Sequence, residues 1–150
     1  MNQIKSDGTE DRFIFITTPM RSGSTLLTRM LSAHPSVDIS YDSLNFFRYC
    51  YGRYDPIYDP VQRKRLLKDT SYRLQHRFGM ELDVERCYLN IGDQDFSYGQ
   101  VYRTILRELF EKTGKTVLGD KEALAWTKIP SFLEMCPNGK VIVILRDPRD

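Results

Sequence analysis

The feature that most constrains the fold is a short polar loop between an apolar strand and an amphipathic helix. Residues 12–17, RFIFIT, are apolar, aromatic and β-branched, which predicts a buried strand. The loop follows at residues 18–25, TPMRSGST. After it, apolar residues recur at helical spacing until His34 and Pro35, where the helix ends because a proline disfavours the helical conformation in the residue before it. The order strand, loop, helix predicts the first half of a βαβ unit.

Later segments continue this α/β pattern. Residues 97–110 begin with Ser97 and Gln100 in the spacing of a capping box and continue as an apolar helical stripe. Residues 140–145, KVIVIL, form an uninterrupted β-branched run, which is typical of a parallel strand covered on both faces. A short strand at 116–119 and a helix at 129–135 lie between them. The chain is therefore predicted to adopt a three-layer, P-loop-like α/β fold with a parallel sheet flanked by helices.

The loop carries the groups that bind phosphate. A helix N-terminus offers unpaired backbone N–H groups and the positive end of the helix dipole, and Gly23 lets an anion approach the backbone. Ser22, Ser24 and Thr25 add hydroxyl donors, and Arg21 adds a full positive charge. The loop is not a Walker A motif, because that motif requires a lysine at the position of Ser24. The residues predict a phosphate cradle of another kind.

Composition and charge exclude several other classes. The net charge is +2, from 22 Lys and Arg against 20 Asp and Glu, too small to indicate a nucleic-acid partner. No segment approaches the roughly 20 apolar residues of a transmembrane helix, and residues 1–8 lack the apolar region of a signal peptide. Three scattered cysteines and two histidines form no metal-ligand pattern. We expect a cytoplasmic protein without a membrane span or a metal, and the oligomeric state stays open.

Two blocks of the chain resemble one enzyme family. The loop is similar to the 5′-phosphosulfate loop of sulfotransferases, P-x-[RK]-S-G-[ST]-T-x-[LW]. The matching residues are Pro19, Arg21, Ser22, Gly23, Ser24, Thr25 and Leu27. The likeness continues through residues 30–35, MLSAHP, as in the branch that includes tyrosylprotein and many bacterial sulfotransferases. Residues 119–122, GDKE, and 146–150, RDPRD, resemble the same family's run to its 3′-phosphate-binding strand.

The resemblance implies a donor, a reaction and a set of roles. The donor is 3′-phosphoadenosine 5′-phosphosulfate (PAPS), and a sulfuryl group passes to an acceptor hydroxyl or amine without a metal. Arg21 and the rest of the loop hold the 5′-phosphosulfate, and Lys121 stabilises the leaving oxygen. Asp42 stands where the tyrosylprotein relatives carry a glutamate base, with His34 as a rival base. Two residues later these relatives carry an arginine, and Leu44 in its place argues against a tyrosine acceptor.

Arg146 has two interpretations. At the carboxyl end of a parallel strand, where open α/β sheets bind ligands, its guanidinium can clamp the 3′-phosphate in two places. Alternatively, it pairs with Asp147 or Asp150 in a structural turn. The basic run within the helix predicted at 61–78 is likewise open to two interpretations, a solvated face or a docking patch for an acidic acceptor. Residues 41–60, rich in aromatic side chains, are expected to end in a turn or loop.

Two other functions compete with the sulfotransferase. One is a P-loop nucleotide kinase, which the absent Walker lysine disfavours. The other is a truncated, non-catalytic domain that binds a nucleotide or another anion. The family's pattern continues beyond the RDPRD run, so residues 1–150 are expected to form a single sulfotransferase-like domain that is incomplete at its C-terminus. PAPS and its product 3′-phosphoadenosine 5′-phosphate (PAP) are the expected small-molecule partners.

Overall fold

A parallel sheet lies at the centre of the protein. The computed structural model describes residues 12–92 and 96–147. The sheet has four strands in the order β2-β3-β1-β4, and each of its pairings is parallel. The strands are β1 (Arg12–Thr18), β2 (Val37–Tyr41), β3 (Val117–Ala123) and β4 (Lys140–Val143). The predicted strands at 12–17 and 140–145 therefore do share one parallel sheet, so their carboxyl ends open onto the same edge.

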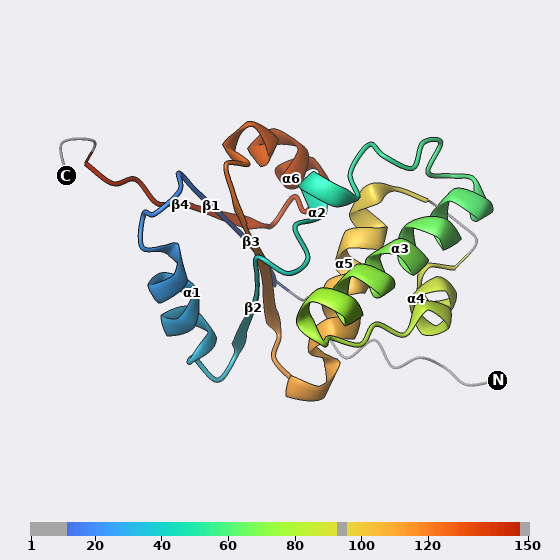
Figure 1. Cartoon of the computed structure of the whole chain (residues 1–150), viewed down its shortest axis with the longest axis horizontal. Helices are drawn as coiled ribbons and strands as arrows, with labels where there is room; N and C mark the ends of the chain where they lie inside the picture. The colour runs from blue at the N-terminus through green and yellow to red at the C-terminus, as the bar shows by residue number, and fades with distance from the viewer. Residues whose placement is uncertain (1–11, 93–95, 148–150) are drawn as a thin grey trace.

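Helices cover both faces of the sheet (Figure 1). On one face lies α1 (Ser24–Ser32), next to β2. The other helices lie on the opposite side, with α3 and α4 farther from the sheet than α5. They are α2 (Phe46–Tyr49), α3 (Pro60–Phe78), α4 (Val84–Ile91), α5 (Tyr98–Phe110) and α6 (Ile129–Met135). This arrangement confirms the predicted three-layer α/β fold. In the part of the chain that the structure describes, no helix has the length and apolar character needed to cross a membrane.

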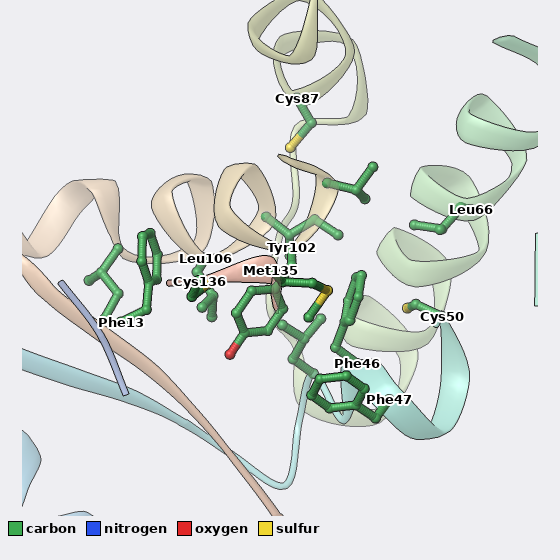
Figure 2. Close-up of a cluster of buried hydrophobic side chains, with 14 of the residues drawn as sticks. Phe13, Phe46, Phe47, Cys50, Leu66, Cys87, Tyr102, Leu106, Met135 and Cys136 are labelled. Carbon is green, nitrogen blue, oxygen red and sulfur yellow. The ribbon is translucent and has the colours of Figure 1, made fainter. Parts of the chain in front are cut away.

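The main core lies between the sheet and the helices opposite α1. Phe15 of β1 stacks on Phe132 of α6 and meets Phe47 of α2 edge-on, each at a centroid distance of 5.2 Å. Tyr102 of α5 is fully buried against Phe46. Figure 2 shows how aromatic, leucine and sulfur-containing side chains from these helices fill this space. Because successive residues of a strand point to opposite faces, the alternate residues of β1 supply this core.

Local capping signals mark the ends of two helices. Ser97 accepts a hydrogen bond from the backbone N–H of Gln100 at the start of α5, as the capping box predicts. Asp59 caps α3 in the same way through the N–H of Val61. Gly79 then ends α3 in the left-handed conformation, with φ at 63°. Helix α3 thus covers the predicted helix at 61–78.

Strand β4 differs from its prediction. It ends at Val143, two residues earlier than expected, and it lies at the edge of the sheet rather than in a fully covered position. Val143 is 45% exposed and Leu145 is 78% exposed. The prediction of burial on both faces was wrong because composition reports the apolar character of a strand but not its position in the strand order.

Gly119 in the middle of β3 allows close packing of three strands. It pairs with Ile14 of β1 and with Ile39 of β2. A Cβ atom at this position would lie 2.5 Å from Ile39 Cδ1 and 2.7 Å from the Ile14 carbonyl oxygen. Both separations are far below van der Waals contact, so no residue with a side chain fits here without displacing its neighbours.

Candidate functional site

The loop after β1 turns sharply because two of its residues adopt the left-handed conformation. Arg21 has φ at 62° and Gly23, the N-cap of α1, has φ at 82°. Ser22 Oγ donates to the Pro19 carbonyl oxygen at 2.6 Å, which closes the turn. A Cβ atom on Gly23 would meet nothing within 4 Å, so this glycine serves the backbone conformation and leaves the start of α1 open. The loop therefore connects strand to helix as predicted.

A cleft of about 510 Å³ opens beside this loop, at the carboxyl ends of β2 and β3. Every residue of the loop, 18–25, lines it. The remaining lining residues come from the end of β2, α2, α3 and β3: Tyr41, Asp42, Asn45, Arg48, Tyr49, Arg77, Lys121 and Ala123. The site residues predicted at positions 21–25, 42 and 121 thus line one cleft, although up to 100 positions separate them in the chain.

Lys121 and Asp42 form an ion pair in the cleft. The Lys121 ammonium donates to Asp42 Oδ2 at 2.7 Å. The lysine side chain is 5% exposed and the aspartate side chain 39%, so the ammonium lies below the more accessible carboxylate. The sheet register explains this ion pair, because Tyr41 pairs directly with Lys121 and Asp42 follows Tyr41. A buried cation and an accessible acid therefore lie at the same point of the cleft.

Tyr41 joins the two sides of the cleft. Its hydroxyl lies 2.5 Å from Thr25 Oγ1 in the first turn of α1. Its ring lies under the Lys121 ammonium, 4.9 Å from the ring centroid. Sequence reasoning missed Tyr41, although its place directly before Asp42 was a usable signal. The Thr25 hydroxyl predicted to bind an anion is therefore hydrogen-bonded to a residue from another strand.

Arg146 and His34 lie outside the cleft's described lining. Arg146 is exposed, and its Nη1 donates to the Arg21 carbonyl oxygen at 3.5 Å, so it reaches the loop from the β4 side. The end of the RDPRD run, residues 148–150, lies outside the described residues. His34 follows the far end of α1, where its Nδ1 accepts from the Ser36 N–H. Nine helical residues span about 13 Å, which separates His34 from the loop.

The basic run of α3 divides into three environments. Arg77 is exposed and lines the cleft, together with Arg48 of α2. Arg73 is half-buried and donates to two backbone carbonyl groups, while Arg63 is buried and donates to the Tyr58 carbonyl oxygen. The basic run of α3 is therefore not simply a solvated face, because one of its arginines is half-buried and another is buried. Sequence reasoning did not place Arg48 or Arg77 at the site, because their approach depends on the packing of α2 and α3 beside β3.

Two buried acids lie just behind the cleft, on the opposite face of β3. Asp120 is fully buried and Glu122 is 3% exposed. Burial raises the pKa of Asp120 to about 7. Burial, and secondly the neighbouring Asp120 carboxylate, raise the pKa of Glu122 to about 8. Sequence reasoning gave these acids no role, although the alternation acid, lysine, acid at the end of a buried strand places the two acids on one face.

The chain matches one known protein family over most of its length. A comparison with curated proteins finds no match. The model of the sulfotransferase family matches residues 13–150, a span that includes β1, the loop, the Lys121–Asp42 pair and Arg146. The match covers nearly the whole chain and every residue that was singled out in the loop and the cleft. The chain therefore belongs to the sulfotransferase family.

Proposed function

We propose that this protein transfers a sulfuryl group from PAPS to an acceptor hydroxyl or amine. The observation that carries the proposal is the convergence of the loop, Lys121 and Asp42 on one cleft. Four cationic side chains and one carboxylate are found among the lining residues that the structure describes. Such a balance suits an anionic donor, and the volume of about 510 Å³ is of the order of a small-molecule site.

The loop supplies the donor's contacts. The free N–H groups at the start of α1 and the Arg21 guanidinium bind the 5′-phosphosulfate, whose charge the helix dipole favours. During transfer the bond between sulfur and the bridging phosphate oxygen breaks, and negative charge grows on that oxygen. A cation that is already in position stabilises this charge without reorganising at the moment of reaction. Lys121, buried and fixed by its ion pair, takes this role.

Asp42 acts on the acceptor. As the acceptor oxygen or nitrogen bonds to sulfur, it loses a proton, and a carboxylate within hydrogen-bond reach takes this proton. The Asp42 carboxylate is the accessible member of the ion pair, so an acceptor can reach it while Lys121 stays beneath. Proton removal and charge neutralisation then occur at one centre, as transfer reactions governed by positioning require. Arg146, at the β4 side of the loop, is proposed to bind the donor's 3′-phosphate.

One experiment on nucleotide binding and transfer tests the proposal. The chain should bind PAP well below millimolar concentrations, with weak competition by ATP, and should transfer labelled sulfate from PAPS to a panel of hydroxyl and amine acceptors. Tight ATP binding that depends on magnesium would instead support a nucleotide kinase. PAP binding without transfer to any acceptor would support a non-catalytic domain.

The Asp42→Asn variant separates binding from chemistry. We expect PAP affinity near that of the wild type and a loss of transfer of about 100-fold or more, the lower range for general base catalysis. The matched control is Asp38→Asn on the same strand, because Asp38 pairs with Lys115 away from the cleft. Asp38→Asn should leave transfer unchanged. Equal rates in the two variants would remove Asp42 from the mechanism.

A further inference from the structure

The segment that carries Asp42 into the cleft, residues 42–47, passes twice through the left-handed backbone conformation. It comprises the connection between β2 and α2 and the first two residues of α2, and it contributes Asp42 and Asn45 to the cleft lining. Asp42 has φ at 49° and Asn45 has φ at 44°, both in the left-handed region, which aspartate and asparagine adopt more readily than other residues with a side chain. Asn45 Nδ2 donates to the Asp42 carbonyl oxygen at 2.7 Å. Local side-chain contacts of this kind help to fix the turn, and the rest of the segment is held by contacts from other elements.

Two carboxylates of β3 hold the end of this segment. The Phe46 N–H donates to Asp120 Oδ2 at 3.3 Å, and the Phe47 N–H donates to Glu122 Oε2 at 3.1 Å. More than 70 positions separate the partners in each of these hydrogen bonds. The acids flank Lys121 in the strand, so they point to the face opposite its side chain. Three consecutive residues of β3 therefore contact the segment from both sides of the sheet.

Side chains also bind the carbonyl groups of the segment. Arg73 of α3 donates to the Ser43 carbonyl oxygen at 2.5 Å and to the Leu44 carbonyl oxygen at 2.6 Å. The Leu44 N–H donates to Ser40 Oγ at 3.0 Å, and the Asp42 N–H donates to the Lys121 carbonyl oxygen at 3.3 Å. Groups from β2, β3 and α3 thus hold the backbone of residues 42–47.

Stability alone does not account for two buried carboxylates at this place. Burying a carboxyl group costs free energy in either protonation state, and well-packed apolar residues often replace buried ionisable groups without loss of stability. Leu118, on the same face of β3, shows that this face accepts an apolar side chain. An apolar residue at position 120 or 122, however, has no oxygen to accept the N–H of Phe46 or Phe47.

We infer that Asp120 and Glu122 are positioning residues, which hold residues 42–47 so that the Asp42 carboxylate meets the Lys121 ammonium. The inference rests on the proposed role of Asp42 as proton acceptor. The two acids do not touch the cleft; they act through the backbone of the segment. A displacement of about 1 Å at a reacting group can cost about 100-fold in rate, so a contact behind the site can control the reaction.

The test compares two substitutions at one position of the full chain. Glu122→Leu keeps a large buried side chain but removes the oxygen that accepts the Phe47 N–H, whereas Glu122→Gln has nearly the same shape and retains an oxygen there. Hydrogen exchange of the Phe47 amide, read by NMR, should accelerate at least about tenfold in Glu122→Leu and stay near the wild-type rate in Glu122→Gln. Asp120→Leu is the second variant, with the same expectation at the Phe46 amide.

Transfer kinetics give the functional half of the test. We expect kcat to fall about tenfold or more in Glu122→Leu and to recover in Glu122→Gln, while PAP affinity stays unchanged in both. The matched control is Leu118→Ala, which removes apolar contacts on the same face of β3 but no hydrogen-bond acceptor of residues 42–47. It should lower the free energy of unfolding and leave kcat unaffected, and it should accelerate the Phe46 and Phe47 amides no more than the other core amides.

The outcomes separate this inference from the proposed function. Wild-type exchange at both amides and wild-type kcat in the two leucine variants would overturn the positioning role. The same changes in Leu118→Ala would also overturn it, because they would reflect general destabilisation. A wild-type chain that binds PAP but transfers no sulfuryl group refutes the proposed function instead, and the exchange rates then still decide whether the two acids hold the segment.

Discussion

The two faces of the sheet are built differently. On the face opposite α1, side chains such as Phe15, Tyr102 and Phe132 are fully buried in one continuous core. On the other face, the buried residues of α1 are the small polar Ser24 and Thr28. Leu26 and Met30 of this helix are each 65% exposed. The face opposite α1, here called the thick face, therefore supplies most of the apolar burial. The face that α1 covers, here called the thin face, carries the cleft at its edge.

The two faces therefore have different roles: one stabilises the fold, and the other carries the groups proposed for binding and transfer. A loop that binds an anion needs unpaired N–H groups and cations that stay accessible, which a packed core does not tolerate. Lys121 faces the thin side, whereas Asp120 and Glu122 face the thick side. Apart from the two positioning acids Asp120 and Glu122, substitutions on the thick face should therefore change mainly the free energy of unfolding, and those that line the cleft on the thin face should change binding and transfer.

The largest effect is expected from Phe132→Ala. This ring stacks on Phe15 and meets Tyr102, so its removal leaves a cavity in the core and should cost about 3–5 kcal/mol of stability. Leu26→Ala on the thin face is the control and should stay within about 0.5 kcal/mol. Urea unfolding of both variants checks this, and similar losses in the two would contradict the contrast between the faces.

The next largest effect is expected from Arg21→Ala. Loss of a hydrogen bond to a charged ligand should weaken PAP binding by about 1.5–3 kcal/mol, roughly 10-fold to 150-fold. Arg21 is exposed, so the free energy of unfolding should hardly change. Calorimetric titration with PAP measures the effect, with Arg29→Ala, an exposed arginine of α1, as the control. Unchanged affinity in folded Arg21→Ala would remove this residue from the donor site.

A smaller effect is expected from pH. In the folded chain the pKa values of Asp120 and Glu122 are raised to about 7 and about 8, so between about pH 4 and pH 8 the folded state holds more protons than the unfolded state. The free energy of unfolding should therefore fall as pH rises through this range. The Arg73 guanidinium lowers the pKa of Asp120 and the Asp42 carboxylate raises it, while the Arg48 guanidinium lowers the pKa of Glu122.

The Glu122→Gln variant sharpens this pH prediction. It removes one of the two titrating acids, so its stability should decline less steeply with pH than that of the wild type. Urea unfolding at several pH values between about 5 and 9 provides the measurement. Parallel curves for the variant and the wild type would show that Glu122 does not carry a raised pKa.

The smallest effect is expected from Arg77→Gln. Arg77 is an exposed cation of the cleft lining, so it should attract an acceptor that carries a negative charge. Contacts between exposed charges contribute about 0.2–1 kcal/mol, which predicts a rise of up to about fivefold in KM for such an acceptor. Donor affinity should not change. Lys68→Gln, an exposed α3 residue outside the described cleft lining, is the control, and equal KM values in both variants would favour the solvated-face interpretation.

Much of the fold was predictable because its signals are local. Apolar runs and capping residues indicated β1, α1, α3 and α5 within a few positions. The convergence of Arg21, Asp42 and Lys121 followed only from the resemblance to a family, because no periodic pattern connects residues that are up to 100 positions apart. The support behind the site was not foreseen, since it depends on the strand order and on which residues pair across strands.

Gly119 favours the native register of β3 against its two neighbouring strands. If β3 paired one residue out of place, its side chains would exchange faces, so two carboxylates would enter the cleft and a lysine would enter the core. Such a shift would also bring Leu118 or Asp120 to the narrow place between Ile14 and Ile39, where even one Cβ atom collides. The absent side chain at position 119 thus disfavours the slipped pairings and favours the alignment of β3 that gives the cleft its ammonium.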